Sequence, residues 1–246
     1  MIPNKIHFCW FGGNKKPEII ENCIESWKRY MPEFSIIEWN ERNYDIHKSK
    51  YMIEAYNYKK WAFVSDYARF DILNEYGGIY FDTDAELLKP IPQAILEHDA
   101  FTGIESAGTV NPGLVMGSIP KHPFLEQILN VYESQSFSQQ IKEGRCKTVN
   151  EYTTEILEGY GFMQENTFQI VDGIAIYPSS IFCGYDQDTH SYDISEETVS
   201  VHHYAGSWKK KSTKNTIIRF LVNSIGINKY RKLLSIKRKL FGYSKH

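Results

Sequence analysis

Apolar residues are grouped into short runs along the first third of the chain, and each run is followed by a glycine or a polar residue. The runs are rich in β-forming side chains and predict three strands, at residues 5–11, 34–39 and 79–81. Residues 17–30 carry apolar side chains at three- and four-residue spacing after a proline, which predicts a helix. A stronger helical pattern covers residues 61–76 and ends at Gly77. Strand, helix and strand of these lengths predict a βαβ unit and an α/β fold.

The pattern is looser after residue 85, but short strands and helices still follow one another. Strands are predicted at residues 100–105 and 199–204, and at 169–177 with a turn at Asp172 and Gly173. Residues 111–117 predict a turn followed by a short strand, and helices are predicted at 124–133 and 149–159. A hydrophobic content of 42% with 24% charged residues is ordinary for a globular protein. The 246 residues contain no internal repeat and allow one large domain or two small ones. We predict one domain over residues 1–208, because the composition changes at residue 209.

Charge is unevenly distributed although the net charge is only −2. Residues 209–246 contain 12 of the 28 Lys and Arg residues and no Asp or Glu, so the first 208 residues carry 16 basic and all 30 acidic side chains. Apolar residues recur among these basic ones at helical spacing, which predicts a basic amphipathic helical extension lying on an anionic membrane surface. The alternative is a helical pair packed on the acidic domain. A nucleic-acid partner is not expected, because no fold signal for one accompanies the charge.

The four cysteines have neither the spacing of a zinc site nor that of a redox pair: Cys9, Cys23, Cys146 and Cys183. A reducing cytoplasm is the simplest environment for them. The sequence has no apolar run near the roughly 20 residues that span a bilayer. Together with the basic extension, this predicts a cytoplasmic protein bound peripherally to the inner face of the cytoplasmic membrane.

Two carboxylates follow the third predicted strand, in the stretch Gly77 to Asp84. Asp82 and Asp84 are expected just past the carboxyl end of that strand, where open α/β sheets bind ligands. Oxygen ligands at such a point suit Mg²⁺ or Mn²⁺. The alternative is an acidic turn. Asp66 and Arg69 share one face of the preceding helix, either near these aspartates or as an exposed ion pair of little energetic value.

Aromatic and histidine residues end two other predicted strands. Trp10 and Phe11 precede Gly12 and Gly13, an arrangement that can stack a flat ring and let the backbone approach it. Core packing followed by a turn explains the same residues and is favoured from them alone. The pair His202–His203 ends the strand at 199–204 and supplies either a metal ligand or a hydrogen-bonded core residue.

Four blocks, in this order, resemble glycosyltransferase family 32, the "DXD sugar-binding" enzymes that include bacterial capsular polysaccharide transferases and yeast mannosyltransferases. The blocks are residues 2–13, 62–84, 176–183 and 202–208. Two departures concern the acceptor side and leave the acceptor open. Gly184 stands where relatives often have proline, and residues 146–153 lack a Thr-Gly-Pro common in the family.

The resemblance implies a GT-A fold, with a Rossmann-like mixed sheet flanked by helices. It also implies a UDP-sugar donor and Mn²⁺ or Mg²⁺. The residues carried over to catalysis are Asp66, Arg69, Asp82 and Asp84. Those carried over to donor binding are Trp10, Phe11, Gly12, Asp66, Arg69, Tyr80, Asp82, Ser207 and Trp208. The acceptor side corresponds to Glu105 and Asn111, and the metal ligands to Asp82 and Asp84 with His203 or His202.

The function that the resemblance implies is a metal-dependent hexosyltransferase. It would move a sugar from a nucleotide-sugar to a hydroxyl of a growing, lipid-linked surface glycan, in capsule, exopolysaccharide or O-antigen (lipopolysaccharide) synthesis, with retention. One alternative is a phosphohydrolase with an aspartyl nucleophile. That motif usually ends the first strand and continues with Thr or Val, whereas Ala85 follows here. The other alternative is a non-enzymatic membrane-surface binding module.

Overall fold

The computed structural model describes residues 1–105, 108–186 and 191–205. The predictions made for Ser207, Trp208 and the basic extension therefore lie outside the described residues. No helix in the described ranges is both long and apolar enough to cross a bilayer.

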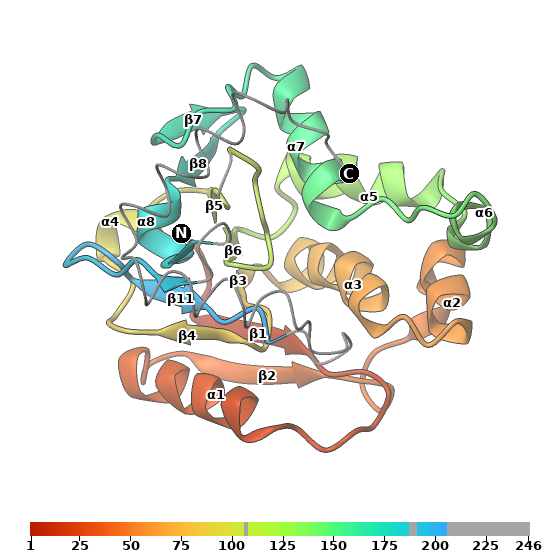
Figure 1. Cartoon of the computed structure of the whole chain (residues 1–246), viewed down its shortest axis with the longest axis horizontal. Helices are drawn as coiled ribbons and strands as arrows, with labels where there is room; N and C mark the ends of the chain where they lie inside the picture. Colours follow the sequence, from red (N-terminus) through yellow and green to blue (C-terminus); the bar gives the residue numbers. More distant parts are fainter. Residues whose placement is uncertain (106–107, 187–190, 206–246) are drawn as a thin grey trace, which may run out of the picture.

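A seven-stranded mixed sheet forms the centre of the molecule, in the order β2-β1-β3-β6-β5-β8-β7 (Figure 1). Its strands are β1 (Lys5–Cys9), β2 (Ser35–Trp39), β3 (Gly78–Tyr80), β5 (Ala100–Gly103), β6 (Met116–Ser118), β7 (Gln169–Val171) and β8 (Ile174–Tyr177). β1 lies parallel to both β2 and β3, and β5 lies parallel to β8. β6 is antiparallel to its neighbours β3 and β5, and β7 is antiparallel to β8. The predicted βαβ unit and the mixed sheet are both present.

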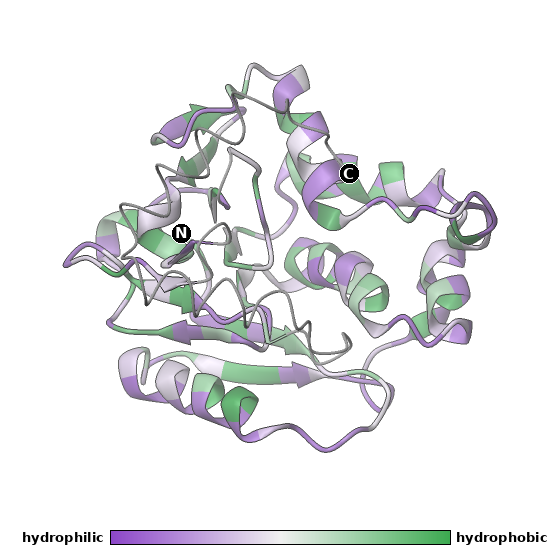
Figure 2. Cartoon of the chain, viewed as in Figure 1, coloured by the Kyte–Doolittle hydropathy of each residue, from purple (hydrophilic) through white to green (hydrophobic). Residues whose placement is uncertain are grey.

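Helices cover both faces of the sheet (Figure 1). They are α1 (Glu18–Tyr30), α2 (Lys50–Asn57), α3 (Trp61–Tyr76), α4 (Gln93–Leu96), α5 (Pro123–Glu133), α6 (Phe137–Lys142), α7 (Val149–Gly159) and α8 (Ser179–Phe182), with a 3₁₀ turn η1 (Ile46–Lys48). Figure 2 shows hydrophobic and hydrophilic segments on the same helices, as expected where a helix buries one face.

The strands alternate their side chains between two hydrophobic cores. In β1, Ile6 and Phe8 join the core that contains α1, whereas Cys9 joins the core that contains α3, α5 and α7. In β3 and the residue after it, Ile79 and Phe81 point to the first core and Tyr80 to the second. A strand buried on both faces accepts no charged side chain in its interior. This is why the acidic residues begin only beyond β3.

A small second sheet pairs β4 (Ala85–Leu87) with β11 (Ser200–His202), antiparallel, with His202 opposite Ala85. α1 supports β4, because the Trp27 indole N–H donates to the Ala85 carbonyl at 2.8 Å. The short hairpin β9 (Tyr185–Asp186) and β10 (Ser191–Tyr192) lies in the same half of the sequence. The β4–β11 pairing brings the end of the described chain to the segment that follows β3.

Two predicted strands need correction, and the predicted turns are present. The first strand ends at Cys9, so Trp10 and Phe11 belong to the loop after it. The turn and short strand predicted within 111–117 are confirmed, with a loop up to Val115 and a strand from Met116 onward. Residues 169–177 form a hairpin of two strands, whose turn residues Asp172 and Gly173 have φ of 48° and 78°.

Candidate functional site

Asp82 and Asp84 lie where the sequence places them, beyond the carboxyl end of β3 and before β4. Because β1 runs parallel to β3, the loop that begins at Trp10 leaves the sheet at the same edge. Gly77 and Gly78, with φ of 59° and 107°, turn the chain sharply from α3 into β3. A Cβ on Gly78 would lie 2.7 Å from the Lys5 carbonyl oxygen, so this turn requires glycine.

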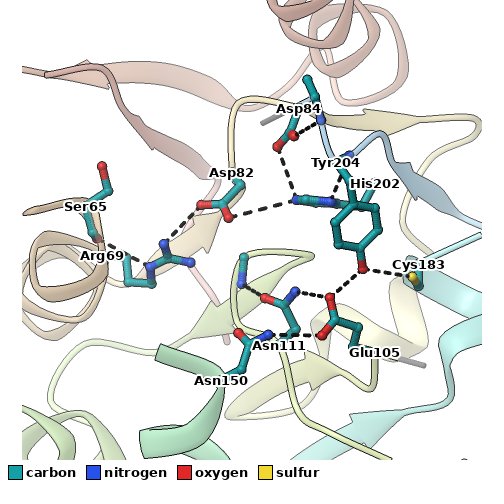
Figure 3. Close-up of polar contacts among 12 residues, drawn as sticks. Ser65, Arg69, Asp82, Asp84, Glu105, Asn111, Asn150, Cys183, His202 and Tyr204 are labelled. Carbon is teal, nitrogen blue, oxygen red and sulfur yellow. Dashed lines mark hydrogen bonds and ion pairs between the residues drawn. The ribbon is translucent and has the colours of Figure 1, made fainter. Parts of the chain in front are cut away.

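Arg69 joins the helix to the acidic segment. Its Nη2 lies 2.7 Å from Asp66 Oδ1, and its guanidinium lies over the Tyr80 ring. The same nitrogen lies 3.1 Å from Asp82 Oδ1 (Figure 3). The Arg69 side chain is only 2% exposed. The exposed-ion-pair interpretation of Asp66 and Arg69 therefore does not hold, because the pair is buried and shared with Asp82. The Tyr80 ring packs against the Arg69 guanidinium, with 4.8 Å between Cζ and the ring centroid.

Burial and charge act against each other in this group. Burial raises the pKa of Asp66 to about 7, against the opposing effect of the Arg69 charge. Burial also disfavours the charged form of Asp82, but Arg69 and His202 hold the pKa of that carboxyl below its usual value. Asp82 is therefore an anion at neutral pH, available to a cation.

His202 is the histidine that reaches the aspartates. Its Nε2 lies 3.1 Å from Asp84 Oδ1 and 3.9 Å from Asp82 Oδ2. This nitrogen is buried but makes no hydrogen bond of normal geometry with either carboxylate. Burial alone would lower the pKa of His202, yet the two aspartates raise it well above the usual value. The pKa of Asp84 falls to about 2 despite burial, because His202 and the Ala205 N–H stabilise the anion.

His203 points away from this group. Its Nε2 is hydrogen-bonded to Glu86 Oε2 at 2.8 Å and its Nδ1 to the Tyr192 hydroxyl at 2.6 Å. Neighbouring residues of an extended strand face opposite sides, so only one of the two histidines can meet the aspartates. The structure gives that position to His202, which corrects the expectation that named His203 first.

Asp82, Asp84 and His202 together present two carboxylates and one imidazole nitrogen. Such oxygen and nitrogen donors fit Mg²⁺ or Mn²⁺, and the buried His202 Nε2 without a hydrogen bond is the feature that a metal would satisfy. Within the described ranges, no three or more Asp, Glu, His or Cys side chains are already arranged to enclose an ion. The described residues therefore offer a partial ligand set for a divalent cation.

Of the residues after β1, Phe11 and Gly12 follow the interpretation of core packing and a turn, and Trp10 stays partly exposed. The Trp10 indole N–H donates to the Asn14 carbonyl at 2.7 Å, and Phe11 is buried edge-on against Tyr44. Gly12 has a φ of 88°, and a Cβ there would lie 2.5 Å from the Trp61 ring. The close approach at Gly12 is thus to Trp61 of the chain itself. Trp10 and Trp61 remain available as aromatic walls.

Glu105 and Asn111 lie together on the other side of the site (Figure 3). Glu105 Oε1 accepts from the Tyr204 hydroxyl at 2.6 Å and from Asn111 Nδ2 at 3.1 Å, and Oε2 accepts from Asn150 Nδ2 at 3.1 Å. Asn111 Oδ1 accepts the Gly113 N–H, and the Gly113 carbonyl accepts the Asp82 N–H at 2.9 Å. The predicted acceptor residues are therefore linked directly to the aspartate segment.

A cleft of about 700 Å³ joins the aspartate–histidine group to Glu105 and Asn111. Its lining includes Trp10, Trp61, Arg69, Asp82, Asp84, Glu105, Asn111, Asn150, His202 and Tyr204. Sequence reasoning did not select Trp61, Asn150 or Tyr204. Tyr204 directly follows the histidine pair, and this position along the sequence could have identified it. Asn150 lies in the segment 146–153, where the resemblance is weaker, and no sequence feature singled it out.

The known proteins that this chain resembles are glycosyltransferases. A family described as "glycosyltransferase sugar-binding region containing DXD motif" matches residues 17–102. An uncharacterised glycosyltransferase of Acanthamoeba polyphaga mimivirus is 26% identical over 196 residues, which cover 74% of this chain and 75% of that protein. Inositol phosphoceramide mannosyltransferase 1 of Schizosaccharomyces pombe is 31% identical over 142 residues, 52% of this chain and 42% of that enzyme. This chain thus matches less than half the length of the yeast enzyme.

Among solved structures, the glycosyltransferase GlyE of Streptococcus pneumoniae superposes with a TM-score of 0.50 at 14% identity. The match covers 94% of this chain and 64% of that one. At this identity the likeness concerns the fold alone, an α/β mixed sheet flanked by helices of the GT-A type.

Proposed function

We propose, from the premise that this chain belongs to the glycosyltransferase family whose sugar-binding region contains a DXD motif, that it transfers a hexose from a nucleotide-sugar to a glycan hydroxyl. The observation that carries the proposal is the arrangement in the cleft: Asp82 and Asp84 beyond β3, with Arg69 and His202 on either side. The matched region includes both aspartates and Arg69. We expect a UDP-sugar as donor, with Trp10 or Trp61 stacking on the base.

The reaction breaks the bond between the sugar anomeric carbon and the phosphate oxygen, so negative charge grows on the diphosphate. A divalent metal held by Asp82, Asp84 and His202 would supply Lewis-acid stabilisation of that charge. Arg69 keeps Asp82 ionised and fixed in place. Its Nη1 is buried and has no partner among the described residues, so one more donor faces this region.

We propose transfer with retention by front-side attack, in which the acceptor hydroxyl passes its proton to the leaving phosphate. The four carboxylates of the cleft all have partners within the protein, and this supports front-side attack. Asp66 and Asp82 are paired with Arg69, Asp84 faces His202, and Glu105 accepts from three neutral side chains. None of these four is held apart as a ready covalent nucleophile.

The two alternative functions fit the geometry less well. A phosphohydrolase needs a free aspartyl nucleophile, but here the first aspartate is paired with Arg69 and follows the third strand of the chain. A binding module would gain nothing from gathering Asp82 and Asp84 with the buried Asp66, Arg69 and His202 in one cleft, because burying charge is costly unless a function uses it. The acceptor proposed for the transferase is a lipid-linked surface glycan at the inner membrane face. The basic sequence of residues 209–246 supports that location.

Nucleotide release from a panel of UDP- and GDP-hexoses, with Mn²⁺ or with EDTA, tests the proposed activity. We expect Mn²⁺-dependent release of UDP, lost in Asp84→Asn. Asp172→Asn is the matched control, because this turn residue has a φ of 48°, which asparagine accepts as readily. Release of phosphate from p-nitrophenyl phosphate, with no nucleotide released from any donor, would replace the transferase proposal by the phosphohydrolase.

A further inference from the structure

Glu105 is the centre of a hydrogen-bonded group that the proposed donor chemistry does not use. Its carboxylate accepts from Tyr204, Asn111 and Asn150, which belong to three separate segments of the chain. The backbone of Tyr204 is in an unfavourable conformation, because its φ of 48° lies in the left-handed region that bulky residues rarely adopt. Its ring also packs edge-on against His202, with 4.3 Å between ring centroids. The group thus adjoins the aspartate–histidine site.

An ionised carboxylate only accepts hydrogen bonds, so it dictates the orientation of any amide that faces it. Asn111 and Asn150 must both turn their NH₂ groups toward Glu105. Asn111 then uses its oxygen as well, since Oδ1 accepts the Gly113 N–H at 2.7 Å. Both polar atoms of the Asn111 amide are thus engaged within the protein, and Asn111 holds the loop that carries Gly113 next to Asp82.

Asn150 is in the opposite situation. Its Nδ2 donates to Glu105, while its Oδ1 has no protein partner in the described part of the chain. Figure 3 shows this oxygen on the side of the amide away from Glu105, and Asn150 lines the cleft. The residue is fixed at the start of α7 by a capping box between Thr148 and Glu151. A rigidly held acceptor atom is thereby presented to the cleft.

We propose that Asn150 contacts the acceptor, with its Oδ1 accepting a hydrogen bond from a hydroxyl of an acceptor hexoside, and that Glu105 is the positioning residue that fixes this orientation. The assignment rests on the proposed function and adds to it the group that holds the acceptor. It gives Glu105 a role that requires no chemistry at its own oxygens. It also places acceptor recognition at the start of α7.

Glu105→Gln should reverse the orientation of the Asn150 amide. A glutamine at this position has one accepting oxygen and one NH₂ group for three donors. Asn111 cannot turn over, because Gly113 holds its oxygen. The glutamine NH₂ therefore faces Asn150, whose amide turns over and presents NH₂ to the cleft in place of oxygen. Glu105→Gln and Asn150→Ala should consequently remove the same contact.

The test uses the full chain, the donor that gives Mn²⁺-dependent release, and p-nitrophenyl α- and β-hexosides as acceptors. Loss of one hydrogen bond should raise the KM for the hexoside about tenfold in Asn150→Ala and in Glu105→Gln, with a much smaller change in the donor KM. The double variant should be no worse than either single variant. Asn130→Ala is the matched control on an exposed position of α5, and thermal melting checks the fold of each variant.

Additive effects of the two substitutions would overturn the assignment, as would equal rises in the donor and acceptor KM or an unchanged acceptor KM in Asn150→Ala. Nucleotide release by the wild-type chain without transfer to any hexoside would overturn the acceptor class. If no donor gives metal-dependent release, the proposed function itself fails, and that result is recognised before any variant is compared.

Discussion

Arg69 shows how single residues set the electrostatics of the cleft. It is nearly fully buried and lies between Asp66 and Asp82, so the positive charge is compensated within the helix and across to the acidic segment. Buried ion pairs contribute little net stability, because desolvation offsets most of the attraction. We therefore attribute the arrangement to function, since it keeps Asp82 charged in a site where burial alone would favour the neutral acid.

Asp84→Asn should reduce turnover by about a thousandfold, because the variant loses one of two anionic oxygen ligands where charge develops. Stability should change by less than about 2 kcal/mol, since asparagine still accepts the Ala205 N–H and only the attraction to His202 is lost. Turnover with Mn²⁺ and urea unfolding in EDTA measure the two effects. Near-native turnover would remove Asp84 from the site.

His7 is a buried residue that connects the sheet to the turn before the aspartates. Its Nδ1 accepts the Trp39 indole N–H at 3.0 Å, so its Nε2 carries the proton and donates to the Gly77 carbonyl at 2.9 Å. Burial lowers the pKa of His7 from 6.5 to about 4, although the hydrogen bond to Gly77 opposes the shift. The folded protein thus holds this imidazole neutral.

Because the pKa of His7 is lower in the folded state, its contribution to stability is complete above pH 6.5 and is lost as the pH falls toward 4. The free energy of unfolding should fall by about 2 kcal/mol from this group between pH 7.5 and pH 5. His7→Gln should lower stability at pH 7.5 but lose this part of the pH dependence. Urea titrations at the two pH values measure the free energy of unfolding of both proteins. An equal change in that free energy between pH 7.5 and pH 5 in wild type and His7→Gln would contradict the assignment to His7.

At the scale of elements, the loop between β5 and β6 positions Asp82 through backbone contact. The Gly113 carbonyl accepts the Asp82 N–H, and a Cβ on Gly113 would lie 2.1 Å from Asp82 Oδ2. The backbone of Gly113 does not have a positive φ, so space and not conformation requires glycine here. The loop therefore limits where the Asp82 carboxylate can lie.

Gly113→Ala should displace the Asp82 carboxylate and lower kcat/KM by about a hundredfold, the usual effect of a misplacement near 1 Å. Overpacking should cost about 1–3 kcal/mol of stability. The Mn²⁺ concentration that gives half-maximal activity should be higher in Gly113→Ala than in the wild type. Gly159→Ala is the control, since a Cβ at this end of α7 meets open space. Equal metal requirements in wild type and Gly113→Ala would show that Asp82 is not constrained by this loop.

At the scale of the whole molecule, the acidic first 208 residues and the basic residues 209–246 predict two separate surfaces. Each basic residue near an anionic leaflet contributes about 1 kcal/mol, so a cluster of this size can hold a protein at a membrane. Attraction to the acidic domain would compete with that binding and would require no lipid.

The full chain should sediment with vesicles containing phosphatidylglycerol at low salt and be released at high salt, because the interaction is largely electrostatic. A version ending at Trp208 should stay in solution. Full-length protein with Lys237→Gln, Arg238→Gln and Lys239→Gln should bind more weakly, which separates charge from apolar contact. Equal sedimentation of all three proteins would exclude the extension as the membrane anchor.

The sequence by itself determined the elements around the acidic pair. Short apolar runs, the glycines at 77 and 78 and the helical spacing of 61–76 act through local conformation and burial, and these are readable without a structure. The same local rules place Asp82 and Asp84 past a strand end, because a strand buried on both faces cannot contain them. The predicted fold class and the resemblance to a glycosyltransferase family followed in large part from this region.

Only the tertiary structure decided which side chains complete the site. Helical spacing puts Asp66 and Arg69 on one face, but their burial depends on packing against Tyr80 and Asp82. The register of β11 on β4 chooses His202 over His203, and a shift of one residue would reverse that choice. The orientation of Asn150 depends on a carboxylate distant in sequence. Such contacts arise from pairing between remote segments, and no local pattern along the chain encodes them.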